Sequence, residues 1–125
     1  MILDTNAVSA LLSGDRGLEA VLSGADRHHL PVIVIGEYHF GLLGSQKRRR
    51  LEALFRRLVG ESVVLDVDRQ TGELYAQIRY ELKRKGQPIP ENDVWIAPLA
   101  RQFNLEVVSR DPHFDAIDGL KRVSW

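Results

Sequence analysis

The feature that most constrains the fold is the alternation of short apolar segments, several of them rich in β-branched residues, with longer segments of helical periodicity. Helical spacing is clearest where apolar residues recur at i, i+3, i+4 and i+7, in Leu51, Leu54, Phe55 and Leu58. Strand-like segments are predicted at 1–3, 30–32, 63–65, 105–109 and 123–125. Helices are predicted at 7–12, 18–22, 33–43, 51–58 (ended by Gly60), 68–85 and 90–103. Strands separated by helices form a parallel sheet through right-handed crossovers. The sequence therefore predicts one α/β domain over residues 1–125, a three-layer α/β/α sandwich with a central, mostly parallel sheet.

Composition narrows the class of protein. Hydrophobic residues make up 44% of the 125 residues and charged residues 27%, which is ordinary for a globular domain and excludes a disordered chain. No apolar run approaches the ~18 residues that a membrane span needs, and the start lacks the basic region of a secretory signal. The absence of cysteine excludes disulfides, zinc–thiolate sites and thiol nucleophiles. We therefore expect a cytoplasmic protein with no membrane contact.

Two acids follow predicted strands, where parallel α/β sheets place their ligand sites. Asp4 comes directly after the strand at 1–3, and Asp111 lies just beyond the strand at 105–109. Ligands of such sheets bind outside the carboxyl ends of the strands. For either aspartate alone, we favour the interpretation that it caps the following turn. Their common position at one sheet edge makes them candidate site residues.

Two further acids lie on apolar helical faces. Glu37 is three or four residues from Ile33, Val34 and Phe40, and Asp93 bears the same relation to Ile96 and Ala97. A buried carboxylate needs a cation, a hydrogen-bond donor or a proton, so an arginine, backbone amides or solvation at the rim remain alternatives for either one. Four carboxylates at one edge repel one another, and a divalent cation removes that repulsion. Oxygen ligands without cysteine or paired histidines favour Mg²⁺ or Mn²⁺ over Zn²⁺.

Four motifs carry a resemblance to a known family. They are Asp4-Thr5-Asn6-Ala7, Pro31-Val32-Ile33 before Gly36-Glu37, Asn92-Asp93-Val94-Trp95-Ile96-Ala97, and Ser109-Arg110-Asp111-Pro112-His113-Phe114. In order and spacing they resemble a PIN-domain ribonuclease, and more narrowly a VapC-type toxin of a toxin–antitoxin pair. The resemblance implies that Asp4, Glu37, Asp93 and Asp111 are catalytic and hold Mg²⁺ or Mn²⁺ to hydrolyse RNA. It also implies a small antitoxin partner and a homodimer.

The resemblance assigns supporting roles to neighbouring residues and shows one departure. Thr5, Asn6 and Ser109 would orient the carboxylates or a water, although turn and cap chemistry explains them equally well. Asp115 is either a fifth acid of the site or, as we favour, a loop aspartate. Pro98 departs from the family pattern and is expected to kink its helix just after Asp93.

The basic residues leave several interpretations open. Arg110 is a candidate RNA contact because it adjoins Asp111. The run 47–50 either tracks phosphates or, as we favour, forms a solvated helix start or a contact with an antitoxin or a second subunit. His113 is interpreted as structural or as a minor substrate contact.

Two other functions compete with the nuclease. The first is a receiver-like Mg²⁺-binding signalling domain with Asp66 or Asp68 as phosphoacceptor, although Thr5 stands where a second acid would be expected. The second is a catalytically inactive PIN-like module that acts by binding alone.

Overall fold

The computed structural model describes residues 1–125 and contains one parallel five-stranded sheet. The strands are ordered β3-β2-β1-β4-β5, and every adjacent pair is parallel. Their bounds are β1 (Ile2–Leu3), β2 (His29–Pro31), β3 (Val63–Leu65), β4 (Val107–Val108) and β5 (Arg122–Val123). Each lies within or at the margin of a predicted strand, so the parallel-sheet prediction is confirmed.

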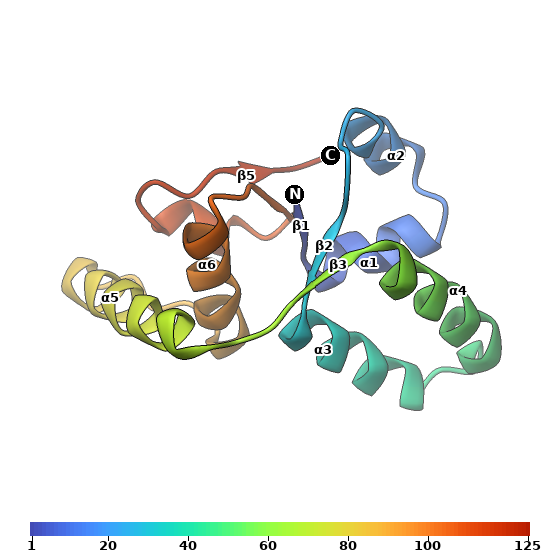
Figure 1. Ribbon diagram of the computed structural model, residues 1–125, viewed down its shortest axis with the longest axis horizontal. Helices are drawn as coiled ribbons and strands as arrows, with labels where there is room; N and C mark the ends of the chain where they lie inside the picture. The colour runs from blue at the N-terminus through green and yellow to red at the C-terminus, as the bar shows by residue number, and fades with distance from the viewer.

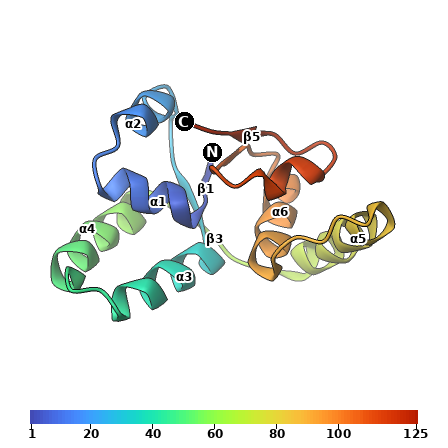
Figure 2. The same cartoon turned by 180° about the vertical axis from the view of Figure 1, so that it is seen from behind.

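Helices cover both sides of this sheet. Their bounds are α1 (Thr5–Leu12), α2 (Arg16–Leu22), α3 (Val32–Leu43), α4 (Arg48–Glu61), α5 (Arg69–Lys85) and α6 (Glu91–Phe103), with a 3-10 turn η1 (Pro112–Ala116). Helices α1 to α4 lie on one side of the strands and α5 and α6 on the other in both views (Figures 1 and 2). The predicted α/β/α layering is therefore confirmed. None of these helices combines the length and apolar character that crossing a bilayer requires.

The core lies where the central strands meet the helices. Ile2 and Leu3 of β1 and Val107 and Val108 of β4 are completely buried. Such continuously apolar strands are typical of parallel sheets that are covered on both faces. Of the predicted stripe in α4, Phe55 and Leu58 are buried and Leu51 packs against the core, so most of it is ordinary core.

The chain order creates a switch point between β1 and β4. From β1 the sheet grows outward through β2 and β3 on one side, and through β4 and β5 on the other. Residue Leu3 pairs with Val108, so the residues that follow both strands emerge side by side. A crevice at such a point is where open α/β sheets bind ligands.

The structure corrects two local predictions and bears on a third. Helix α4 begins at Arg48 and runs through Gly60 to Glu61, because glycine lowers helix stability without ending a helix that packs well. Phe40 is 79% exposed, so it does not share a buried face with Glu37, which lies at the rim of that face. Pro98 lies inside α6, and Asp93 lies in the first turn, before the position at which the proline removes a hydrogen bond; the kink itself stays a prediction.

Candidate functional site

Asp4 is held by donors from both sides of the switch point. It caps α1 by accepting a hydrogen bond from the Thr5 amide at 2.8 Å. Its Oδ2 accepts from Ser109 Oγ at 2.7 Å and from Asn6 Nδ2 at 3.3 Å. The capping interpretation is thus confirmed for Asp4, and its role as a metal ligand stays a prediction. The cap and the Ser109 contact fix the carboxylate at the end of β1.

Asn6 and Ser109 also tie this carboxylate to the segment after β4. Asn6 Nδ2 donates to Ser109 Oγ at 3.1 Å, and Asn6 Oδ1 accepts from the Arg110 amide at 3.2 Å. The Asp111 amide donates to Ser109 Oγ at 3.0 Å. The two polar side chains therefore set the path of the chain from β4 to Asp111. Their predicted supporting role fits these contacts.

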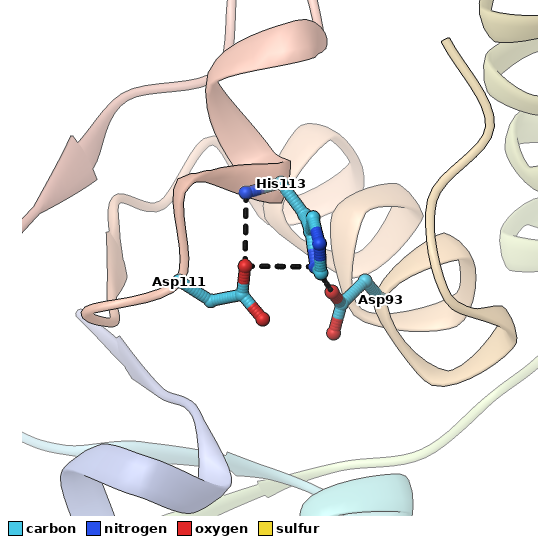
Figure 3. Close-up of side chains that lie close together, drawn as sticks. All are labelled: Asp93, Asp111 and His113. Atoms are coloured by element: carbon cyan, nitrogen blue, oxygen red, sulfur yellow. Dashed lines mark hydrogen bonds and ion pairs between the residues drawn. The ribbon is translucent and has the colours of Figure 1, made fainter.

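Asp111, His113 and Asp93 form the second half of the cluster. Asp111 begins η1 and accepts a hydrogen bond from the His113 amide at 3.0 Å. The His113 ring turns back, so its Nδ1 lies 2.7 Å from Asp111 Oδ1 and 3.1 Å from Asp93 Oδ2 (Figure 3). Asp93 reaches this point from the first turn of α6, on the other side of the sheet from α1. Imidazole and both carboxylates face one another.

Glu37 lies at the margin of this cluster. It comes from the middle of α3 and is half-buried. Desolvation raises the pKa of its carboxyl, a hydrogen bond from Asn92 partly opposes this, and the charge of Asp4 raises it further. The charge of Asp4 therefore acts on Glu37, but Glu37 is not among the groups that contact His113.

The carboxylates repel one another, which makes their ionised forms less favourable. Desolvation, reinforced by repulsion from Asp4 and Asp111, raises the pKa of Asp93 to about 6 despite its contact with His113. Desolvation and the charge of Asp111 also raise the pKa of Asp4, while its hydrogen bonds from Ser109 and Thr5 lower it. Charges act on one another in this way only over short distances. Asp93 and Asp111 therefore meet at His113. Asp4 is joined to Asp111 through the Ser109 hydroxyl, and Glu37 lies beside Asp4.

The donor set fits a divalent cation. Asp93, Asp111 and His113 each offer an atom within 4.8 Å of the others. A cation at this point would neutralise the repulsion that raises the carboxyl pKa values. Nearby, Thr5 Oγ1 is buried and has no hydrogen-bond partner of good geometry. It nevertheless lies close enough to Glu37 to lower the pKa of that carboxyl. An unpartnered hydroxyl beside an acidic cluster suits a site that takes up a hydrated ion.

The sequence did not show that His113 contacts two acids. Its spacing to other histidines gave no signal, since its partners are carboxylates from two elements. The only available hint was its position two residues after Asp111, where an aspartate-capped turn brings the chain back on itself.

Other predicted residues have partners elsewhere. The Arg110 guanidinium lies 4.4 Å from the centroid of the Trp125 ring and 3.3 Å from Asp15. It therefore contacts Trp125 and Asp15 and not the acids of the cluster. Asp115 pairs with Arg122 at 2.9 Å, which agrees with the favoured interpretation that it is not a site acid.

The receiver-like alternative lacks support in the structure. Its candidate acceptor Asp68 caps α5 in a reciprocal capping box with Thr71, and Gln102 donates to it. Asp66 is exposed at the end of β3, an edge strand of the sheet. Neither residue belongs to the acidic cluster at β1 and β4.

Comparison with known proteins gives consistent results. The PIN domain family model matches residues 1–120. The chain is 31% identical to Ribonuclease VapC5 of Mycobacterium tuberculosis, over 98% of this chain and 90% of that protein. It is 32% identical to the tRNA(fMet)-specific endonuclease VapC of Shigella flexneri, over 74% and 71% of the two chains. A crystal structure of DNA-bound VapBC from Salmonella typhimurium matches with a TM-score of 0.87 and 29% identity, covering 99% of this chain and 96% of that one.

Proposed function

The chain belongs to the PIN domain family, and we propose that it is a metal-dependent endoribonuclease and the toxin of a toxin–antitoxin pair. The observation that carries this proposal is the meeting of Asp93, Asp111 and His113 beside Asp4 at the switch point between β1 and β4. Relatives along nearly the whole chain are named ribonucleases, which supports the same reaction class. All four acids of the family pattern are present, which argues against an inactive binding module.

We assign the ion to Mg²⁺ or Mn²⁺, held by Asp4, Asp93 and Asp111. Glu37 would hold it directly or through a water, and His113 is close enough to contribute a nitrogen. A bound divalent ion supplies Lewis-acid polarisation of the phosphoryl oxygen and lowers the pKa of a water. Carboxylate oxygens suit both ions, whereas a nitrogen ligand suits Mn²⁺ better than Mg²⁺.

The protein's own groups prepare the carboxylates for this reaction. Ser109 and Asn6 hold Asp4 in place by hydrogen bonds of 2.7 and 3.3 Å, so it does not reorganise when substrate arrives. Glu37, with a raised pKa, is suited to orient the attacking water and to accept its proton. Attack by water leaves a 5′-phosphate and a 3′-hydroxyl.

We also propose that a small cognate antitoxin binds this chain. Structures to which it is similar include a VapBC complex from Haemophilus influenzae and FitAB bound to a DNA fragment. An arginine from such a partner would offset the acidic cluster in place of a cation. Homodimerisation stays a prediction, with Leu54, 36% exposed on α4, as the part of the stripe that is available for it.

Sequencing of RNA ends tests the proposed activity. Total RNA is treated with the purified protein in Mg²⁺ or Mn²⁺, with and without chelator, and new 5′-phosphate ends are mapped. We expect discrete ends that disappear with chelator and with Asp111→Asn. Asp66→Asn is the matched control, because it makes the same change at an exposed aspartate outside the cluster. Cleavage that survives Asp111→Asn, or that requires Asp66, would contradict the proposal.

A further inference from the structure

A groove leads away from the acidic cluster between α1 and α3. Its volume is about 280 Å³, and Thr5 and Glu37 line it where it meets the cluster. Ser13 and Ser45, just beyond the ends of the two helices, line its far part. Both helices start near the centre of the sheet and extend to the same side (Figure 2). Eight residues separate Thr5 from Ser13, so at 1.5 Å per residue the groove is about 12 Å long.

Four consecutive cations follow Ser45, which lines the far part of the groove. Lys47, Arg48, Arg49 and Arg50 line an adjoining depression of about 370 Å³ and are all exposed. Arg48 pairs with Glu52 at 2.9 Å, whereas no carboxylate lies within ion-pair distance of the other three. The Lys47 amide donates to Ser45 Oγ at 3.1 Å, which joins this cationic start of α4 to the groove.

This charge is unfavourable for the helix itself. The positive end of the helix dipole lies at the start of α4, where acids are normally found, and its first turn contains none. Folding therefore does not explain the cations, whereas an anionic ligand would offset their mutual repulsion. The hydroxyl groups of Ser9 and Ser45, which line the groove, can donate hydrogen bonds to phosphate and ribose oxygens.

We propose that the groove between α1 and α3 carries a single RNA strand from the acidic cluster to the cationic start of α4, where Lys47, Arg49 and Arg50 bind its phosphates. The inference rests on the proposed nuclease function and adds the path of the substrate. A flexible single strand fits a narrow groove between two helices, whereas a duplex does not enter one. Because the groove, about 12 Å long, lies between the acids and the cations, the cations bind nucleotides beyond the bond that is cut.

Binding of a labelled oligouridylate, measured by fluorescence anisotropy in chelator, tests this path without cleavage. Phosphate contacts do not depend on sequence, so a generic single strand is a valid probe. Arg49→Gln/Arg50→Gln removes two contacts, each contributing about 0.7 to the salt slope of a single strand. We expect the slope to fall by about 1.4 and the affinity at 0.1 M salt to fall about 25-fold. Arg56→Gln/Arg57→Gln is the matched control, because it makes the same change on the same helix about 10 Å further along.

A second pair of variants tests the groove itself. Gly41 lines the groove within α3, and a Cβ there would meet no atom within 4 Å, so Gly41→Leu fills the groove without backbone strain. Gly60→Leu adds the same side chain at an open position near the end of α4. We expect Gly41→Leu to weaken binding of the oligouridylate at least tenfold and Gly60→Leu to leave it unchanged.

The outcomes separate this inference from the proposed function. Substrate that is cleaved by all variants with unchanged KM and salt slope would overturn the path while leaving the nuclease intact. Loss of antitoxin binding without any change in RNA binding would assign the groove to a protein partner and also overturn it. A wild-type protein that neither binds nor cuts RNA would contradict both proposals. Raised KM with unchanged kcat in Arg49→Gln/Arg50→Gln would support the path.

Discussion

Asp93→Asn is expected to stabilise the fold while abolishing activity. Burial and two neighbouring acids raise the pKa of Asp93 from 3.8 to about 6, so its ionised form is less stable in the folded state than in the unfolded one. At about 1.36 kcal/mol per pKa unit, the full cost at neutral pH is at most about 3 kcal/mol. Solvent screening and proton sharing reduce this to about 1–2 kcal/mol. For a chain of 125 residues that corresponds to a rise in Tm of roughly 4–8 °C.

The difference in stability between Asp93→Asn and the wild type should grow as the pH rises. The folded pKa lies above the unfolded value, so ionised Asp93 begins to cost stability as pH rises past about 4, and the cost is complete above about pH 7. Thermal melts of both proteins in chelator should therefore diverge with increasing pH and coincide near pH 4. Adding Mg²⁺ should raise the Tm of the wild type and leave the variant almost unchanged, because the ion removes the same repulsion.

One result would refute this reasoning. If Asp93→Asn melts at or below the wild-type temperature at pH 7 in chelator, the carboxylates do not repel one another as the geometry implies. Asp118→Asn is the control, since Asp118 is an exposed aspartate that pairs with Lys85 outside the cluster. That variant should show no stabilisation that grows with pH.

Three further predictions address the supporting contacts and the ion. Ser109→Ala removes the 2.7 Å hydrogen bond to Asp4. We expect it to lower the free energy of unfolding by about 1–2 kcal/mol and the cleavage rate roughly tenfold, and unchanged values in both assays would disprove the positioning role of Ser109. Arg122→Gln breaks the contacts with Asp115 and with the Ser109 carbonyl, so amide hydrogen exchange around Asp111 should become faster. Unaltered exchange would show that this arginine does not stabilise the segment after β4. Chelator should abolish RNA cleavage and Mg²⁺ or Mn²⁺ should restore it, whereas cleavage in chelator would argue against metal dependence.

Much of the fold was predictable because it depends on local patterns. Apolar segments such as 63–65, separated by helical periodicity, were enough to indicate a parallel sheet with helices on both sides. Asp4 and Asp111 could be assigned to one edge because the carboxyl ends of parallel strands emerge together. Asp93 could be assigned to an inward face because its helical neighbours are apolar, and it is buried.

The partners of Arg110 and His113 and the exposure of Phe40 depend on tertiary contacts, which no local sequence pattern encodes. Arg110 could not be connected with Trp125 or Asp15 because these residues are far apart in sequence and meet only when β5 docks at the sheet edge. His113 reaches Asp93 because η1 turns back over the start of α6, and a short 3-10 turn leaves little periodic signal. Phe40 was misassigned because helical spacing identifies a face without showing whether another element covers it.

The central claim is that side chains at the end of β1, in α6 and in the segment after β4 together bind divalent metal. Anomalous diffraction from a crystal soaked in Mn²⁺ tests it most directly. The account predicts one or two anomalous peaks between the carboxylates of Asp4, Asp93 and Asp111, and none at that position in Asp111→Asn. Peaks only elsewhere on the protein, or carboxylates that stay unbound at saturating Mn²⁺, would contradict it.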